Sequence, residues 1–271
     1  YKLKKIRSDA SFREFFRLKK GDKTSIIVTA RKERFRNLIA YSTINKFLRA
    51  KGIHTPKTIS QHFNEGIMEI EDFGDNTLLY SIRKSKNIFP FYKKSINVIL
   101  KLQKIKPINK IKIKSNRNLK LNTYNLKNLH KDSDLFLNWY LPGVLGKRKS
   151  KKFKKKIKIE LNKLYKQIYF KNKFIVHRDF HVSNIMPVKS KLGIIDTQDV
   201  ILGNPLYDVA SLIDDVRTEI PLPIKNKIFQ YYAKKSSLKK NIYFLKNDFD
   251  ILSVQRNLKI LGIFYRLNKR D

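Results

Sequence analysis

A short polar segment between two apolar stretches constrains this chain more than any other feature. The apolar stretches, 174–176 and 192–195, are predicted strands, and the segment that follows the first reads HRDFHVSN, from His177 to Asn184. Asp196 comes directly after the second stretch. Because loops held by strand ends commonly carry functional side chains, we expect one carboxylate, one amide and a second carboxylate to converge here.

The same region loses the basic character of the rest of the chain. The 271 residues include 61 Lys and Arg against 22 Asp and Glu, a formal net charge of +39. From Asp179 to Asp215, six Asp and two Lys give a local net charge of −4. A carboxylate-rich stretch inside so basic a chain favours a site that holds cations.

Asp179, Asn184 and Asp196 are side chains of the types that phosphoryl transfer uses. Oxygen ligands suit Mg²⁺, which keeps several waters and needs only one or two carboxylates beside phosphate oxygens. A remaining Asp can accept a hydroxyl proton or orient the attacking oxygen. Positioning and charge neutralisation supply most of the reduction in the barrier. The alternative is that Asp179 and Asn184 are turn residues and Asp196 caps a strand end.

The motif and its surroundings resemble a known group of enzymes. The spacing H-R-D-x-x-x-x-N is the catalytic-loop signature of protein kinases, and Asp196 stands where kinases carry a metal-binding Asp. The stretch from HRDFHVSNIM to GNPLYDVASLIDDVR resembles the aminoglycoside phosphotransferase and choline kinase-like superfamily. SDASFREFFRL (8–18), LFLNWYLP (135–142) and VQRNLKILGIFYRL (254–267) are similar to the bacterial phosphotransferases that include the N-acetylmuramate/N-acetylglucosamine anomeric kinase.

This resemblance implies an α+β, protein-kinase-like fold with two lobes. The order of predicted elements agrees, since strands at 11–18 and 24–30 and a helix at 34–51 precede a mostly helical remainder. We expect residues 1–74 to form a small nucleotide-binding lobe with an antiparallel sheet. Residues 75–271 would then form the larger, mostly helical catalytic and substrate lobe.

The resemblance also implies roles for the motif residues. Asp179 would be the catalytic base, while Asn184 and Asp196 would ligate Mg²⁺ bridging the phosphates of ATP. Three further residues would support the catalytic loop, namely His177, Arg178 and Asp208. A satisfied core histidine explains His177 equally well.

Nucleotide-binding residues are implied near the N-terminus. The loop over the phosphates would contain Ser8, Asp9, Ala10 and Ser11. The backbone of a hinge between the lobes would meet adenine at Glu71, Asp72 and Phe73.

One expected kinase residue is missing. The strand 24–30, TSIIVTA, lacks the lysine that kinases use to hold the α and β phosphates. Arg31 or Lys32 with Glu33 could replace the usual ion pair, and Arg13 and Arg17 on the preceding strand are alternatives. The sequence leaves this choice open.

The acceptor side is suggested by three residues. Trp139, the only tryptophan, could stack on a sugar face, although burial statistics favour the alternative that it fills the core of its lobe. Asp199 could bind sugar hydroxyls or a cationic substrate, as could Asp214 and Asp215. Arg256 could bind a substrate carboxylate, such as that of a lactyl-bearing sugar, through two hydrogen bonds.

The basic charge has an ordinary explanation. The densest basic run, 147–158, lies on an apolar stripe at helical spacing, which consists of Phe153, Ile157, Leu161, Leu164 and Ile168. We interpret the run as the solvated face of a half-buried helix, so a nucleic-acid partner is not favoured. No apolar run is long enough to predict a membrane span, and the absence of cysteine is compatible with the cytoplasm. Because the chain begins at Tyr1, we expect a longer protein, with room for a fused domain.

The sequence therefore predicts an ATP- and Mg²⁺-dependent phosphotransferase that acts on a hydroxyl group of a small molecule. The resemblance favours the anomeric hydroxyl of an amino sugar in cell-wall recycling. Two alternatives stay open: an aminoglycoside-like or choline-like acceptor, and an accessory module that works with a tRNA-modifying ATPase.

Overall fold

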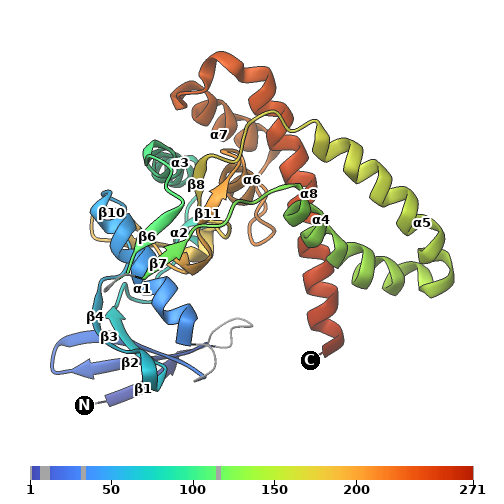
Figure 1. The fold of residues 1–271 in the computed structure, drawn as a ribbon. Coiled ribbons are helices and arrows are strands. Elements are labelled where there is room, and N and C mark those ends of the chain that lie inside the picture. The colour runs from blue at the N-terminus through green and yellow to red at the C-terminus, as the bar shows by residue number, and fades with distance from the viewer. Residues whose placement is uncertain (1, 7–12, 32–34, 114–116, 271) are drawn as a thin grey trace. The chain divides into compact units, whose positions relative to one another are not determined.

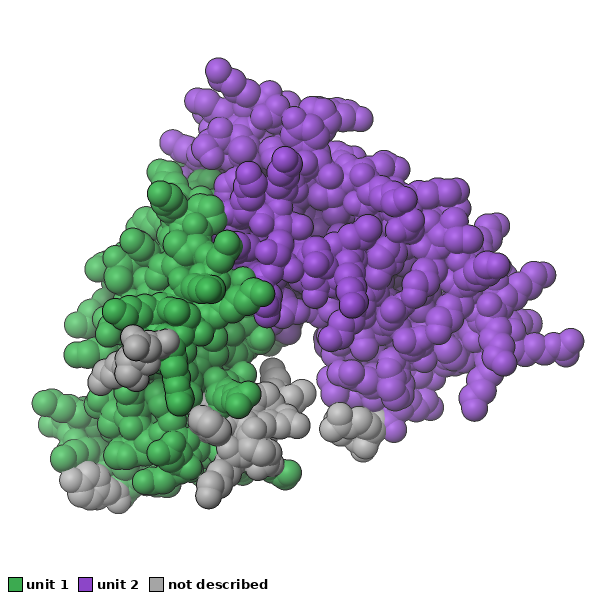
Figure 2. All heavy atoms as spheres, in the orientation of Figure 1, with its two compact units in different colours: residues 1–121, 181–200 green, residues 122–180, 201–271 purple. Residues whose placement is uncertain are grey.

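The computed structural model describes residues 2–6, 13–31, 35–113 and 117–270. The chain divides into two compact units, shown in different colours in Figure 2. Unit 1 comprises residues 1–121 and 181–200, and unit 2 comprises residues 122–180 and 201–271. The segment 181–200, which carries part of the polar motif, thus belongs to the same unit as the N-terminal strands. The lobe boundary at residue 74 remains a prediction.

Unit 1 is built on a five-stranded antiparallel sheet (Figure 1). In spatial order its strands are β1 (Lys2–Ile6), β2 (Arg13–Lys20), β3 (Lys23–Ala30), β5 (Ile67–Glu71) and β4 (Thr58–His62). Helix α1 (Phe35–Ala50) packs on this sheet, where Leu38 and Tyr41 join the buried Val28 and Met68. The predicted strands and helix are confirmed, whereas β1 and β4 were not predicted.

Gly66 allows the chain to turn tightly beside β3. Its φ is +71°, its carbonyl accepts a 2.8 Å hydrogen bond from the amide of Ala30, and an added Cβ would lie 2.2 Å from the Ala30 carbonyl oxygen. A side chain here is strained by the left-handed backbone and also collides with a fixed strand.

We expect Gly66→Ala to lower the free energy of unfolding by about 1–3 kcal/mol. Urea denaturation checks this, with Gly21→Ala as the matched control. Gly21 has a φ of +58° and nothing within 4 Å of an added Cβ, so it reports the backbone cost alone. Equal losses in the two variants would contradict the proposed collision.

The rest of unit 1 is helical, with two small hairpins. Its elements are α2 (Leu78–Arg83), α3 (Phe89–Lys104), β6 (Lys110–Lys112), β7 (Asn118–Lys120), the 3₁₀ turns η2 (Phe63–Glu65), η4 (Val182–Asn184) and η5 (Thr197–Asp199), and β9 (Ile185–Val188) with β10 (Lys191–Ile194). Helix α3 buries Tyr92, Ile96 and Ile99 on one face and exposes lysines on another. Strand β6 pairs antiparallel with β7.

Unit 2 is mostly helical around one short two-stranded sheet. Its elements are α4 (Leu126–Leu135), the π-helical turn η3 (Phe136–Tyr140), α5 (Leu141–Lys166), β8 (Phe174–Val176), β11 (Ile201–Gly203), α6 (Tyr207–Ile213), α7 (Leu222–Lys235), η6 (Lys239–Asn241) and α8 (Ile242–Arg270). Strand β8 pairs antiparallel with β11, directly before the polar motif. Gly262 lets α8 approach the end of α4, since an added Cβ would lie 2.3 Å from the carbonyl carbon of Leu135.

The prediction of a half-buried helix at 147–168 is wrong for its first half. Leu161 is buried, but Phe153 is 43% exposed. Helix α5 is interrupted at Gly146, whose backbone is not helical, and the turns that follow contact η3 and α4 through exposed pairs such as Lys154 with Asn138 and Lys158 with Asp134. The fully buried positions of the apolar stripe therefore begin only at Leu161. No helix in the described part of the chain is both long and apolar enough to cross a membrane.

Candidate active site

In unit 2, the predicted catalytic loop is held at its start by a buried carboxylate. The chain leaves β8 at Val176, and the Asp208 carboxylate accepts hydrogen bonds from the amides of His177 (2.7 Å) and Arg178 (3.0 Å). Asp208 lies in the first turn of α6 and is 2% exposed. Burial raises the pKa of its carboxyl, although the nearby His177 and the two amide hydrogen bonds favour the charged form. The backbone that leads to Asp179 is therefore fixed from α6.

Arg178 has an unusual backbone conformation. Its φ is +77°, in the left-handed region that side chains other than glycine rarely adopt. The guanidinium of Arg256 donates a 3.1 Å hydrogen bond to the Arg178 carbonyl, and the Arg178 guanidinium lies 5.6 Å from the ring centre of Tyr124. Strained residues of this kind persist where the surroundings over-determine them, as commonly happens at active sites.

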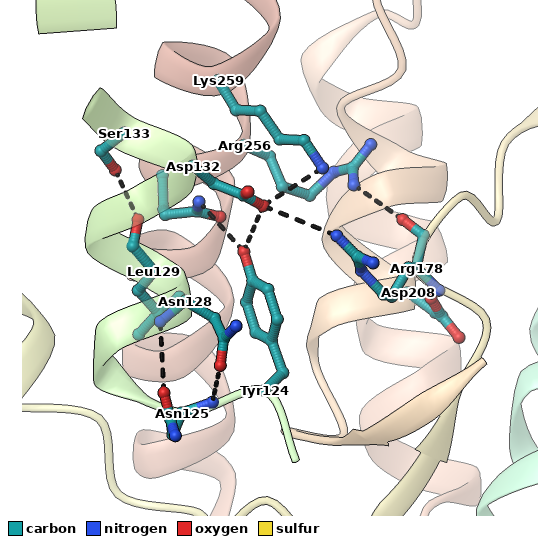
Figure 3. Close-up of polar contacts among 11 residues, drawn as sticks. Tyr124, Asn125, Asn128, Leu129, Asp132, Ser133, Arg178, Asp208, Arg256 and Lys259 are labelled. Carbon is teal, nitrogen blue, oxygen red and sulfur yellow. Dashed lines mark hydrogen bonds and ion pairs between the residues drawn. The ribbon is translucent and has the colours of Figure 1, made fainter. Parts of the chain in front are cut away.

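A polar network on α4 and α8 continues from these residues (Figure 3). The carboxylate of Asp132 accepts a 2.6 Å hydrogen bond from the Tyr124 hydroxyl and lies 3.2 Å from the Lys259 ammonium and 4.0 Å from the Arg178 guanidinium. Gln255 donates to the Tyr124 hydroxyl at 3.3 Å.

Lys259 carries its charge inside this network. Burial alone would lower the pKa of its ammonium, but neighbouring groups that include Asp132 and Asp179 outweigh this effect, so the pKa lies above its ordinary value. Sequence reasoning missed Lys259 and Asp132. A signal existed for Lys259, because it follows Arg256 by three residues and so lies on the same face of a helix. None existed for Asp132.

In unit 1, the β9–β10 hairpin brings the two predicted metal ligands together. Asn184 precedes β9 and Asp196 follows β10, and the amide of Ile195 donates a 3.0 Å hydrogen bond to the Asn184 carbonyl. The Asn184 amide lies 3.3 Å from Nε2 of His181. Asp196 has a left-handed backbone with a φ of +63°. An amide oxygen and a carboxylate at the same end of one hairpin fit a Mg²⁺ ion that also takes phosphate oxygens.

The structure distinguishes the two arginines that the sequence left open. Arg13 is 6% exposed, and its guanidinium lies 2.5 Å from the Asp196 carboxylate and donates a 3.0 Å hydrogen bond to Gln198. Arg17 instead pairs with Asp72 (2.6 Å) and Asp75 (2.7 Å). Only Arg13 of these two therefore contacts a predicted metal ligand. The other predicted alternative, Arg31 or Lys32 paired with Glu33, cannot be compared in this way because residues 32–34 lie outside the described residues.

The predicted hinge residues lie at the end of β5, with Glu71 as its last residue and Asp72 and Phe73 directly after it. Burial alone would raise the pKa of Asp72, but hydrogen bonds from Arg17 and the Gly74 amide outweigh it, so the pKa lies below its ordinary value. The ring of Phe73 lies 4.7 Å from that of His54, and an added Cβ at Gly193 would lie 2.5 Å from the Phe73 ring. The adenine contacts of Glu71, Asp72 and Phe73 remain predictions. The phosphate-loop residues, 8–11, lie outside the described residues.

The predicted acceptor residues have different surroundings. Trp139 is 40% exposed, so the alternative that it fills the core is wrong. Leu137 takes the buried position in η3, and a residue two places later faces the other way on a helix. Stacking of Trp139 on a sugar stays a prediction. Asp199 is exposed and accepts a 3.2 Å hydrogen bond from Gln198.

Two further acidic residues of the motif region are already paired. Lys225 lies 2.6 Å from Asp214, and Arg217 lies 3.0 Å from Asp215. The charge of each carboxylate is therefore already neutralised, which disfavours both as binding groups for a cationic substrate.

Comparison with known proteins agrees with this arrangement. The profile of a family described as the phosphotransferase enzyme family matches residues 2–239. The chain is 26% identical over 269 residues to N-acetylmuramate/N-acetylglucosamine kinase of Pseudomonas aeruginosa, covering 97% of this chain and 76% of that protein. It is 24% identical over 269 residues to the protein of the same name from Neisseria meningitidis, covering 97% and 78%.

Solved structures show the same fold. An ethanolamine kinase of Plasmodium vivax superposes with a TM-score of 0.65 at 14% identity, covering 95% of this chain and 74% of that one. An aminoglycoside phosphotransferase of Streptomyces rimosus superposes with a TM-score of 0.60 at 14% identity, covering 93% and 92%. The fold is thus protein-kinase-like, as predicted. The chain belongs to the phosphotransferase enzyme family and is an ATP-dependent kinase whose acceptor is a hydroxyl group.

Proposed function

We propose that this kinase phosphorylates the anomeric hydroxyl of an N-acetylated amino sugar, N-acetylglucosamine or N-acetylmuramate. The observation that carries the proposal is the similarity to kinases of that name along 97% of the chain. A role in the recycling of cell-wall sugars, in the cytoplasm where ATP is available, belongs to the same proposal.

The proposed roles in phosphoryl transfer follow the local geometry. Asp179 would accept or orient the acceptor hydroxyl, on a loop whose backbone Asp208 and Arg256 hold. Asn184 and Asp196 would hold Mg²⁺, which would neutralise charge on the phosphate oxygens when bound. Because Arg13 already contacts Asp196, we assign to it the phosphate contact that a strand lysine makes in other kinases.

The charges of unit 2 favour a neutral or anionic acceptor over a cation. The acidic side chains near the catalytic loop, Asp132 and Asp208, have their charges balanced by Arg256, Lys259 and Arg178. A choline-like or aminoglycoside-like acceptor needs carboxylates that are not already matched in this way. An amino sugar with neutral N-acetyl and hydroxyl groups does not need such carboxylates.

An acceptor panel tests the proposal. With ATP and Mg²⁺, we expect turnover on N-acetylglucosamine and N-acetylmuramate, and none on choline, ethanolamine or kanamycin. Methyl N-acetylglucosaminide is the sharpest control, because it differs only in having its anomeric hydroxyl blocked. Phosphorylation of this glycoside would exclude the anomeric position, and turnover restricted to the cationic acceptors would exclude the sugar assignment.

The same panel tests the substrate contact of Arg256. Its guanidinium is buried and engaged with the Arg178 carbonyl, so Arg256→Ala should lower kcat for both sugars by disturbing the loop. A contact with the lactyl carboxylate should additionally raise KM for N-acetylmuramate relative to N-acetylglucosamine. If the ratio of the two KM values is unchanged, Arg256 has only the positioning role.

A further inference from the structure

A cavity in unit 1 contains none of the residues assigned above to catalysis or nucleotide binding. Its volume is about 600 Å³, within the range of small-molecule sites. It lies among the end of α1, α2, α3 and the β9–β10 hairpin.

The lining is cationic and contains no carboxylate. It includes Arg49 from α1, Lys94 and Lys101 from α3, and Lys189 and Lys191 from the hairpin. The Arg49 guanidinium donates to the Thr55 carbonyl and lies 3.4 Å from Glu71. Within the described ranges, none of the four lysines forms an ion pair.

The lysines converge because of the local structure. Phe91, Lys94, Val98 and Lys101 are spaced three, four and three residues apart, so one face of α3 presents all four to the cavity. The hairpin turns at Lys189, whose φ is +52°. Lysine is common throughout the chain, so the number of lysines decides nothing. What requires explanation is that lysines from two separate elements line one cavity whose lining contains no carboxylate.

Unneutralised like charges around one space repel each other. The repulsion is only partly screened by salt at separations within about 8–10 Å. A bound polyanion would remove it and would be attracted by all four ammonium groups at once. The lining also contains apolar side chains, such as Leu78 and Leu192, that suit the carbon skeleton of an organic ligand.

His54 supplies an independent observation. It lines the cavity, and its Nδ1 atom is buried with no hydrogen-bond partner among the described residues. A buried polar atom without a partner is uncommon in native structures. Burial lowers the pKa of its imidazole, although Glu71 acts in the opposite direction, and a neutral ring can either donate or accept a hydrogen bond.

We propose that this cavity binds a small organic molecule that carries two or more phosphate groups. The site is additional to those for ATP and the acceptor, and the proposal does not depend on which acceptor the kinase uses.

Fructose 1,6-bisphosphate is a suitable probe, measured by titration calorimetry at fixed ionic strength. The protein is first saturated with a non-hydrolysable ATP analogue, so that the nucleotide site is filled. We expect fructose 1,6-bisphosphate to bind the wild type, and to bind Lys94→Ala/Lys101→Ala at least tenfold more weakly. The matched control, Lys93→Ala/Lys104→Ala, removes the same charge from exposed positions of the same helix outside the lining and should stay within twofold.

A second variant tests the other side of the cavity. Lys189→Ala/Lys191→Ala should weaken binding as the α3 pair does, since both pairs line one space. If the control variant weakened binding equally, the net charge of the chain would explain the effect, and the proposal would be overturned. Absence of binding to the wild type, or unchanged binding in both cavity variants, would overturn it as well.

Discussion

Asp179→Asn is expected to lower kcat by about 10²–10⁴-fold, the contribution typical of a general base in the transition state. The amide keeps the size and hydrogen-bonding geometry of the carboxylate but cannot accept the hydroxyl proton. Nucleotide binding should change little, because Asp179 is assigned to the acceptor and not to ATP. Initial rates with N-acetylglucosamine and calorimetric titration of an ATP analogue measure the two quantities separately.

The control for this experiment is another carboxylate-to-amide change in the same unit. Asp250→Asn, on the exposed side of α8, removes the same charge from a surface pair with Lys246 and should leave kcat within twofold. A loss of kcat below tenfold in Asp179→Asn would contradict the role of Asp179 as the base. If kcat fell strongly and circular dichroism showed that the variant was unfolded, the result would instead indicate a structural role for Asp179.

Arg13→Ala is expected to lower kcat/KM for ATP by about 10²–10³-fold, as the loss of one charge-stabilising donor commonly does. The variant removes the cation assigned to the phosphates and leaves Asp196 without its arginine. Arg13→Lys should recover only part of the activity, because an ammonium keeps the charge but lacks the planar fork of donors that fits a phosphate. Steady-state kinetics with ATP as the varied substrate measure the effect.

Arg17 provides the comparison, since it is four residues later on the same strand and is also engaged in ion pairs. Arg17→Ala breaks its pairs with Asp72 and Asp75 and should lower the melting temperature without a comparable loss of kcat/KM. Because both variants remove a paired arginine, loss of stability alone affects both. Equal kinetic losses in the two variants would contradict the assignment of the phosphate contact to Arg13.

Much of the catalytic motif was predictable because its residues are close together in sequence. His177, Arg178, Asp179 and Asn184 lie within eight residues, and their spacing is recognisable without knowledge of distant contacts. The strands and first helix of unit 1 were predictable from local alternation and helical periodicity. The small strands β1 and β4 were missed, because they are mostly exposed edges whose sequences carry little alternation.

The residues that surround the motif were not predictable in the same way. Lys259 and Asp132 lie on different helices, far apart in sequence, and meet only when α4 and α8 pack. The exposed Trp139 and Phe153 show the same limit, since an apolar residue at helical spacing is buried only if another element covers it.

The sequence by itself therefore determined the family, the first predicted strands and helix of unit 1 and the predicted chemistry of the catalytic loop, because these depend on short-range pattern. Only the tertiary structure decided which arginine contacts Asp196, since Arg13 and Asp196 are 183 residues apart and meet only in the folded unit 1, where the turn η5 after Asp196 packs on α1. It also decided which lysines line the cavity of unit 1. Electrostatic pairing acts over a few ångströms in space, and in a chain with 61 basic residues the sequence does not specify which of them will be neighbours.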